Sequence, residues 1–179
     1  MKQLDGTGMK RLHREWRRRT DDRLAIVLDD VQGPFNVGAV IRTAAALRVE
    51  DVWLAGRTPE PDDTKVGKTA LGTDRYLQFH RVDDGVGAAE AARAAGYWVI
   101  GIELADGAVP LHELALGRAT CVVVGHEDRG LTSATMGACD DVAFLPLLGR
   151  VGSLNVATAA SIALFEARRQ SWARPSTTP

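Results

Sequence analysis

The chain has 179 residues, of which 45% are hydrophobic, and its formal net charge is −1. This length suits a single compact domain, and the balanced charge excludes a uniformly basic nucleic-acid-binding coat but not a local basic patch. The two cysteines, Cys121 and Cys139, are too few for a disulfide framework or a cysteine-based zinc site.

Basic residues crowd into the first twenty positions. Residues 8–20 predict a short helix in which Leu12 and Trp16 are one turn apart and could pack on the rest of the protein. The same segment holds six cationic side chains: Lys10, Arg11, Arg14, Arg17, Arg18 and Arg19. A solvated helix face and an arm that contacts a polyanion both fit this pattern.

The composition divides the chain into three parts. We expect a basic N-terminal helical extension over residues 1–22, one domain over residues 23–172 and a disordered tail over residues 173–179. The N-terminal segment lacks the apolar core of a signal peptide, and no apolar run is long enough to span a bilayer. We therefore expect a cytoplasmic protein that makes no contact with a membrane.

Predicted strands and helices alternate through the main domain. Apolar runs predict strands at residues 24–28, 51–54, 76–82, 97–102, 120–124 and 142–145. Helical patterns cover residues 37–48 (capped by Asn36), 86–95, 131–136 and 153–170. Residues 56–75 are polar and are predicted to form a long loop. This alternation is typical of an α/β domain with a mostly parallel sheet.

Three predicted loops leave strands at the carboxyl edge of this sheet, where ligands of open parallel sheets bind. They cover residues 29–36, 125–130 and 146–153. Each carries polar residues with two interpretations. Arg42, which follows the first loop, could form a surface salt bridge or belong to a functional site. Glu127 could be an exposed charge in a turn or a residue that contacts a ligand. Ser153 could be a helix N-cap or belong to a functional site. Asn155 is harder to explain structurally because Asn is a mediocre helix former.

Three segments, taken in chain order, together form a specific sequence pattern. PFNVGAVIRTA starts at Pro34, VVVGHEDRGL starts at Val122, and LPLLGRVGSLNVATAASIALFE starts at Leu145. Together they resemble the three motifs of the SpoU/TrmH family of RNA ribose 2′-O-methyltransferases in the SPOUT superfamily. The resemblance covers about residues 24–170, which is nearly the whole chain.

The resemblance implies a Rossmann-like SPOUT fold with a parallel sheet and a C-terminal deep trefoil knot, although knots are rare among proteins. It implies a homodimer that binds S-adenosylmethionine in the knot without a metal. The residues at matching positions that would bind this cofactor are Ile102, Glu103, Leu104, Gly125, Gly130, Leu145, Leu147, Ser153 and Leu154.

The family's active-site set carries over to five positions: Asn36, Arg42, Glu127, Ser153 and Asn155. Arg42 is the family's proposed centre of proton removal from the 2′-hydroxyl, but guanidinium groups in proteins stay charged. An alternative is that Arg42 holds a phosphate or stabilises the developing alkoxide. RNA capture would use the basic residues Arg11, Arg14, Arg18 and Arg150, with help from Arg75, His80 and Arg81.

The substrate class stays open between transfer RNA and ribosomal RNA. The segment LGTDRYLQF, residues 71–79, is similar to the equivalent region of enzymes that modify the tRNA D-loop guanosine, which favours tRNA. A non-catalytic RNA-binding protein is the first rival function. A nucleotide-dependent oxidoreductase is a weaker rival because no GxGxxG follows the first strand.

Overall fold

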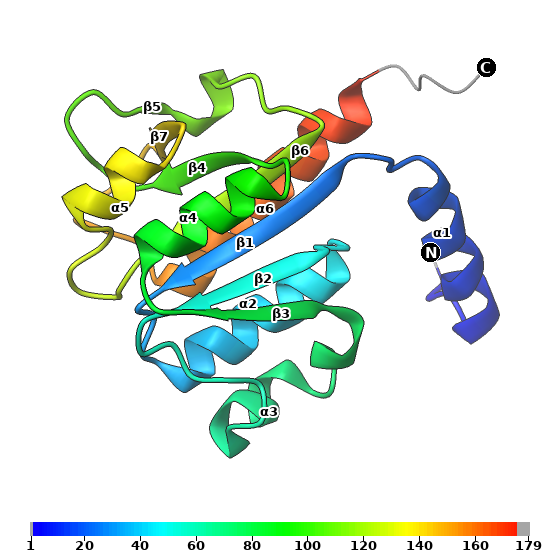
Figure 1. Cartoon of the computed structure of the whole chain (residues 1–179). Coiled ribbons are helices and arrows are strands. Elements are labelled where there is room, and N and C mark those ends of the chain that lie inside the picture. Colours follow the sequence, from blue (N-terminus) through cyan, green and yellow to red (C-terminus); the bar gives the residue numbers. More distant parts are fainter. Residues whose placement is uncertain (1, 175–179) are drawn as a thin grey trace.

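The computed structural model describes residues 2–174. Across this range, seven strands form one parallel sheet in the order β3-β2-β1-β6-β4-β7-β5 (Figure 1). The strands are β1 (Arg23–Asp29), β2 (Asp51–Ala55), β3 (Gln78–Val82), β4 (Trp98–Ile102), β5 (Val109–Pro110), β6 (Ala119–Val124) and β7 (Asp141–Phe144). The helices are α1 (Gly6–Arg18), α2 (Pro34–Ala46), α3 (Thr64–Ala70), α4 (Gly85–Ala94), α5 (Ser133–Ala138) and α6 (Val156–Ala173), with short 3-10 turns η1 (Asp74–Tyr76) and η2 (Leu111–Glu113). The parallel α/β fold predicted from the sequence is confirmed.

The centre of the sheet is its most apolar part. β1 and β6 pair in register from Arg23 with Ala119 to Leu28 with Val124, and the side chains of β1 from Leu24 to Leu28 are buried. A strand that is covered on both faces needs apolar residues at successive positions. This explains why the strands could be predicted from continuous apolar runs in the sequence rather than from alternating ones.

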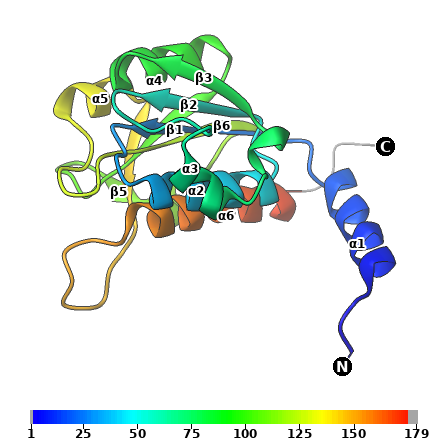
Figure 2. The ribbon, with the colours of Figure 1, turned by 90° about the horizontal axis from the view of Figure 1, so that it is seen from below.

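Helices cover both faces of the sheet. Figure 2 shows α2, α3 and α6 on one side of the strands, and α4 and α5 on the other. Two separate apolar clusters match these layers: one includes Ile41 and Leu164, from α2 and α6, and the other includes Ala88 and Ala92, from α4. The helices cover the two faces of the sheet, whereas loops border its carboxyl edge.

The region after β2 differs from the prediction. Residues 56–63 form an irregular loop as predicted, but α3 and the start of η1 occupy most of residues 64–75. The Asp63 carboxylate caps α3, and Gly38 lets α3 approach α2 closely, since a Cβ there would lie 2.5 Å from the Val66 carbonyl oxygen. The prediction was wrong for α3 because a helix of 7 residues is too short to show a clear period and is stabilised by packing. The short β5 and η2 were also not predicted.

The N-terminal helix extends away from the sheet (Figures 1 and 2). Its contact with the domain runs through Trp16, whose ring centroid lies 5.0 Å from that of Trp172 in α6. Trp16 is 39% exposed and Leu12 is 40% exposed, so the predicted packing is confirmed for Trp16 only through its ring contact with Trp172 and finds no support for Leu12. No helix within residues 2–174 is long and apolar enough to cross a membrane.

The final helix is fixed along its length. The buried Arg168 guanidinium donates to the carbonyl oxygens of Asp22, Leu47 and Arg48, which ties α6 to the entrance of β1 and the end of α2. Such an arrangement satisfies a buried cation with backbone acceptors. It holds α6 in place so that its first residues reach the carboxyl edge.

The predicted disordered tail needs a correction. α6 continues to Ala173, and Arg174 forms an ion pair with Asp22 and donates to the Leu116 carbonyl oxygen. Residues 173–174 therefore belong to the ordered domain, because these contacts hold the chain at its end. Residues 175–179 lie outside the described part of the chain.

Candidate active site

Three loops border the carboxyl edge, as the sequence predicted. We define the first loop as residues 30–33, the second loop as residues 125–132 and the third loop as residues 145–155. A cavity of about 260 Å³ lies here, between the end of β4, the second loop, the third loop and the start of α6. The first loop does not line the cavity but is hydrogen-bonded to the second loop.

All nine residues predicted to bind a cofactor line this one cavity. They are Ile102, Glu103, Leu104, Gly125, Gly130, Leu145, Leu147, Ser153 and Leu154. They come from three segments far apart in the sequence, so the fold brings them together. Their contact with a cofactor stays a prediction.

The second loop is a tight turn with fixed ends. A Cβ on Gly125 would lie 2.5 Å from the carbonyl carbon of Gly130, so glycine is needed for this close approach. Gly130 has a φ of +64° and donates its N–H to the His126 carbonyl oxygen over 2.9 Å. The Glu103 carboxylate accepts the N–H of Leu131 at 2.8 Å. This wall of the cavity is therefore held rigidly by the protein.

Glu127 connects the second loop to the first. Its carboxylate accepts the backbone N–H groups of Gln32 at 3.1 Å and Gly33 at 2.8 Å, and the side-chain amide of Asn36 at 2.9 Å. Burial alone would raise the pKa of Glu127, but these donors outweigh burial and hold its pKa below the usual value of 4.5. Glu127 is thus an ionised acceptor that orders the first turn of α2 rather than an exposed turn residue.

Asn36 joins Glu127 to the third loop. Its amide nitrogen donates to Glu127, and its amide oxygen accepts from the side-chain amide of Asn155 at 3.0 Å. The prediction that Asn36 caps α2 is wrong, because the helix begins at Pro34 after an N-cap at Gly33. Proline suits the first helical position, and this earlier start leaves the Asn36 side chain available for the bridge.

The start of α6 also differs from the prediction. The helix begins at Val156, and Asn155 is its N-cap, with the side-chain oxygen accepting from Ala157 and Thr158. Ser153 is therefore not the N-cap; it is exposed and lines the cavity. Asn155 is well placed for two tasks, since its oxygen caps α6 while its nitrogen reaches Asn36.

Two members of the predicted set, Ser153 and Arg42, are not joined to the others by hydrogen bonds, and Arg42 also does not line the cavity. Arg42 lies on α2 and is exposed, and its side chain makes no hydrogen bond or ion pair with any residue in the range 2–174. The interpretation as a surface salt bridge therefore finds no support. The structure brings Asn36, Glu127 and Asn155 together but gives Arg42 no contact with them.

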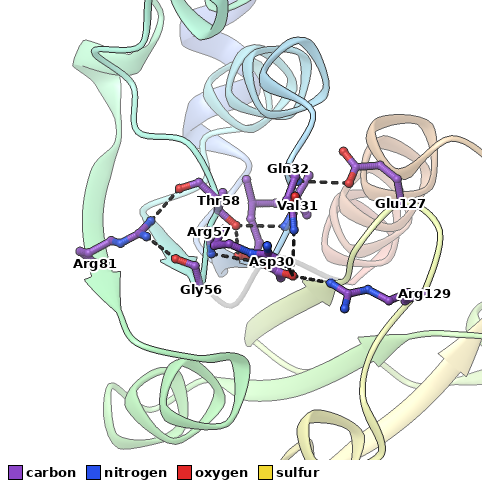
Figure 3. Close-up of polar contacts among 10 residues, drawn as sticks. Asp30, Val31, Gln32, Gly56, Arg57, Thr58, Arg81, Glu127 and Arg129 are labelled. Carbon is purple, nitrogen blue, oxygen red and sulfur yellow. Dashed lines mark hydrogen bonds and ion pairs between the residues drawn. The ribbon is translucent and has the colours of Figure 1, made fainter.

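Sequence reasoning missed a group of charges beside the second loop. Figure 3 shows Asp30, of the first loop, between Arg57 and Arg129. The Asp30 carboxylate lies 2.7 Å from Arg129 and 3.3 Å from Arg57, and Gln32 also donates to it. Burial alone would raise the pKa of Asp30, but Arg57 and Gln32 lower it to about 2. No spacing rule pairs residues 99 positions apart, so the sequence offered no signal.

The residues predicted to contact RNA are exposed. They are Arg11, Arg14 and Arg18 on α1 and Arg150 in the third loop. None of the four forms an ion pair with a carboxylate in the described part of the chain, so their charges are uncompensated at short range. The described residues also contain no group of three or more His, Cys, Asp or Glu side chains that could hold a metal ion.

Comparison with known proteins decides the family. Residues 23–165 match the SpoU rRNA Methylase family. The chain belongs to this family. It is 33% identical over 153 residues to the tRNA (guanosine(18)-2′-O)-methyltransferase of Escherichia coli, which covers 82% of this chain and 63% of that protein. It is also 33% identical over 151 residues to the 23S rRNA (guanosine-2′-O-)-methyltransferase RlmB of Acinetobacter baylyi, with 84% of this chain and 61% of that protein covered.

A solved structure agrees with this family assignment. The SpoU methyltransferase AviRb of Streptomyces viridochromogenes in complex with AdoMet superimposes with a TM-score of 0.76 at 30% identity, over 86% of this chain and 62% of that one. The chain spans 61% to 63% of the length of these two curated relatives and this neighbour. The predicted family and parallel fold are thus confirmed.

Proposed function

We propose that this protein transfers a methyl group from S-adenosylmethionine to a ribose 2′-hydroxyl in structured RNA. The observation that carries the proposal is the hydrogen-bonded series Glu127–Asn36–Asn155 beside the cavity, in a member of the SpoU methylase family. Two similar proteins are named RNA guanosine 2′-O-methyltransferases. A related structure is described as an AdoMet complex.

The cavity suits this cofactor. Gly125 presents backbone without a side chain, Leu145 and Leu154 offer apolar surface for an adenine ring, and Glu103 provides a carboxylate among the lining residues. S-adenosylmethionine is cationic at sulfur, so a cavity with carboxylates in its lining favours it electrostatically. When bound, it supplies an activated methyl group, and positioning of the acceptor is what the protein must add.

The protein's own residues would position the ribose and manage its proton. We assign Asn36, Asn155 and Ser153 to orientation of the ribose or of Arg42, and Glu127 to the geometry of the first loop. Guanidinium groups in proteins are poor bases, so the role we give Arg42 is to hold a phosphate or to stabilise the developing alkoxide. The hydroxyl proton then leaves to a phosphate oxygen or to water.

A homodimer is part of the proposal. Apolar side chains on neighbouring helices are exposed: Phe35 at 57% on α2, and Ile162 at 43% and Phe165 at 52% on α6. α2 and α6 touch through the Thr43 and Ser161 hydroxyls at 3.1 Å, so these side chains belong to one face. Exposed apolar patches of this kind mark interaction sites. Phe35 and Arg42 are seven residues apart, on one side of α2, so a second copy packed here would approach Arg42.

A knotted C-terminal segment is also part of the proposal. β7 lies between β4 and β5 in the sheet, and the chain then returns from the third loop to pack α6 against α2 and β6. The contact between Asn155 and Asn36 joins segments 119 positions apart. These features support the deep trefoil knot that the resemblance implies.

For the substrate, we propose tRNA, with rRNA as the alternative. The basic face of α1 and Arg150 would contact the phosphate backbone, which supplies most nonspecific affinity for RNA. The similarity of residues 71–79 to enzymes for the D-loop guanosine and the E. coli relative favour tRNA. The A. baylyi relative is the observation that favours rRNA.

The test is methyl transfer from tritiated S-adenosylmethionine to purified tRNA and to rRNA, followed by mapping of 2′-O-methyl positions. We expect incorporation into tRNA, and a loss of about 100-fold or more with Arg42→Ala because an electrostatic contact to the reacting group is removed. Arg42→Lys should be little more active than Arg42→Ala if the planar, forked shape of the guanidinium is needed. RNA binding without methyl transfer would overturn the proposal in favour of the non-catalytic alternative.

A further inference from the structure

Two side chains of the second loop reach the first loop. Glu127 accepts backbone N–H groups at Gln32 and Gly33, and Arg129 donates to the Asp30 carboxylate at 2.7 Å. Figure 3 shows both Glu127 and Arg129 directed toward the segment that holds Asp30 and Gln32. Each loop thus contributes one carboxylate to the contact: Asp30 from the first loop and Glu127 from the second loop.

Asp30 is held in an unusual way for a turn residue. Its φ of +55° lies in the left-handed region, which costs an ordinary L-residue roughly 1 kcal/mol and is tolerated best by Gly, Asn and Asp. Its carboxylate accepts the backbone N–H and the guanidinium of Arg57, the Gln32 amide and the Arg129 guanidinium. Its side chain is 23% exposed, so these interactions are partly shielded from water.

The two arginines at Asp30 differ in what lies beside them. Arg129 lines the cavity, and its loop is closed by the near contact between Gly125 and Gly130. Arg57 follows β2 and is not among the residues that line the cavity, although the two side chains are similarly exposed, at 70% for Arg57 and 63% for Arg129. Asp30 therefore has one partner that lines the cavity, Arg129, and one partner that does not, Arg57.

We infer that Asp30 is a positioning residue for the cofactor, which acts through Arg129 to hold the second loop in the shape that lines the cavity. This inference rests on the proposed function, since it takes S-adenosylmethionine as the occupant of the cavity. Asp30 does not line the cavity itself, so its effect reaches the cofactor through Arg129. The rival account is that Asp30 only stabilises the turn at residues 56–58 through Arg57.

Three substitutions in the full chain separate these accounts. Asp30→Asn keeps the shape and the left-handed backbone but removes the charge. Arg129→Gln removes the guanidinium on the cavity side, and Arg57→Gln is the matched control that removes the other guanidinium and leaves the backbone N–H of residue 57 on Asp30. S-adenosylmethionine affinity is measured by calorimetry, the KM for each substrate by methyl transfer, and folding by thermal unfolding.

We expect Asp30→Asn and Arg129→Gln each to weaken S-adenosylmethionine binding by about threefold to fivefold, because the ion pair holds a loop that lines the cavity but Arg129 is 63% exposed. The KM for RNA should change less than twofold, and Arg57→Gln should leave cofactor affinity within about twofold. Arg129→Lys should retain more affinity than Arg129→Gln. The double variant Asp30→Asn/Arg129→Gln should be no weaker than either single variant, because both act through one contact.

Other outcomes overturn the inference. If Arg57→Gln weakens cofactor binding as much as Asp30→Asn does, Asp30 acts through the turn at residues 56–58. If the effects of Asp30→Asn and Arg129→Gln add, Arg129 acts on the cavity without Asp30. If Asp30→Asn binds normally, Asp30 has no positioning role. Failure of the unsubstituted protein to bind S-adenosylmethionine would instead reject the proposed function.

Discussion

Two walls of the same cavity are built in opposite ways. The second loop is joined to the first loop and β4 by Glu127, Arg129 and Glu103. The third loop is held at its end by Asn155, but its residues 146–154 form no hydrogen bond or ion pair with any described residue, and Leu148 is fully exposed. Figure 2 shows this loop, in orange, extending away from the body of the domain. We therefore expect the first wall, which we call the prepared wall, to keep its shape without a ligand and residues 146–154 to become ordered when the cofactor binds.

The largest effect is expected from Gly125→Ala in the prepared wall. The added Cβ would meet the backbone of Gly130 at 2.5 Å, so the turn must open. We expect kcat/KM to fall by about 100-fold or more, since displacement of the cofactor wall misplaces the reacting groups. Gly149→Ala is the matched control in the third loop, where the nearest atom would be 4.0 Å away. Equal losses in the two variants would refute the contrast between the walls.

A somewhat smaller effect is expected from Asn36→Ala, which removes the bridge between the walls. Glu127 and Asn155 each lose one hydrogen bond, but the Asn155 cap of α6 and the backbone donors to Glu127 stay. We expect kcat to fall by about 30-fold, with S-adenosylmethionine affinity changed by less than about threefold. Calorimetry beside steady-state kinetics measures both. A loss confined to cofactor affinity would contradict a role of Asn36 on the acceptor side.

The charge of Glu127 gives a pH test of the prepared wall. Its pKa is held below the usual 4.5 in the folded protein, so its contacts stabilise the fold above that pH and are lost as the pH falls through the lowered value. The free energy of unfolding should therefore decline below about pH 4.5. Glu127→Gln should show a shallower decline in urea titrations between pH 6 and pH 3. Parallel curves would show that Glu127 ionisation does not support the fold.

The smallest effect is expected from Leu148→Ser at the tip of the third loop. The side chain is fully exposed, so the free energy of unfolding should stay within about 0.5 kcal/mol of the original. Thermal unfolding without ligand checks this. A marked loss of stability would mean that Leu148 is packed against another part of the protein, and the third loop would no longer count as an open wall.

Features that are encoded by neighbouring residues could be predicted from the sequence, and features that depend on distant contacts could not. Apolar runs such as Leu24 to Leu28 encode a doubly covered strand locally, so the sheet and its carboxyl edge were predicted. The motif residues of the cavity followed from a family resemblance. The start of α2 at Pro34 was misjudged because a side chain such as Asn36 can cap a helix or make a distant contact, and sequence alone does not decide between them.

The remaining differences depend on tertiary contacts. The seven residues of α3 are stabilised by close packing at Gly38, which no local pattern reveals. The ion pair between Asp30 and Arg129 joins two charged turn residues that look unremarkable in isolation. The Arg42 side chain forms no hydrogen bond or ion pair with residues 2–174, so the role that we propose for it would need RNA or a second copy of the chain. Local patterns therefore predicted the scaffold, while contacts between distant segments determine the site.

Hydrogen–deuterium exchange with and without S-adenosylmethionine tests the central claim most directly, namely that these two walls enclose the cofactor. In the free protein, amides of the second loop should exchange slowly and those of residues 147–154 rapidly. On saturation with S-adenosylmethionine, exchange in residues 147–154 should slow by about tenfold or more, with little change in the second loop. Saturation that leaves both loops unchanged, or that protects a different surface, would contradict the account.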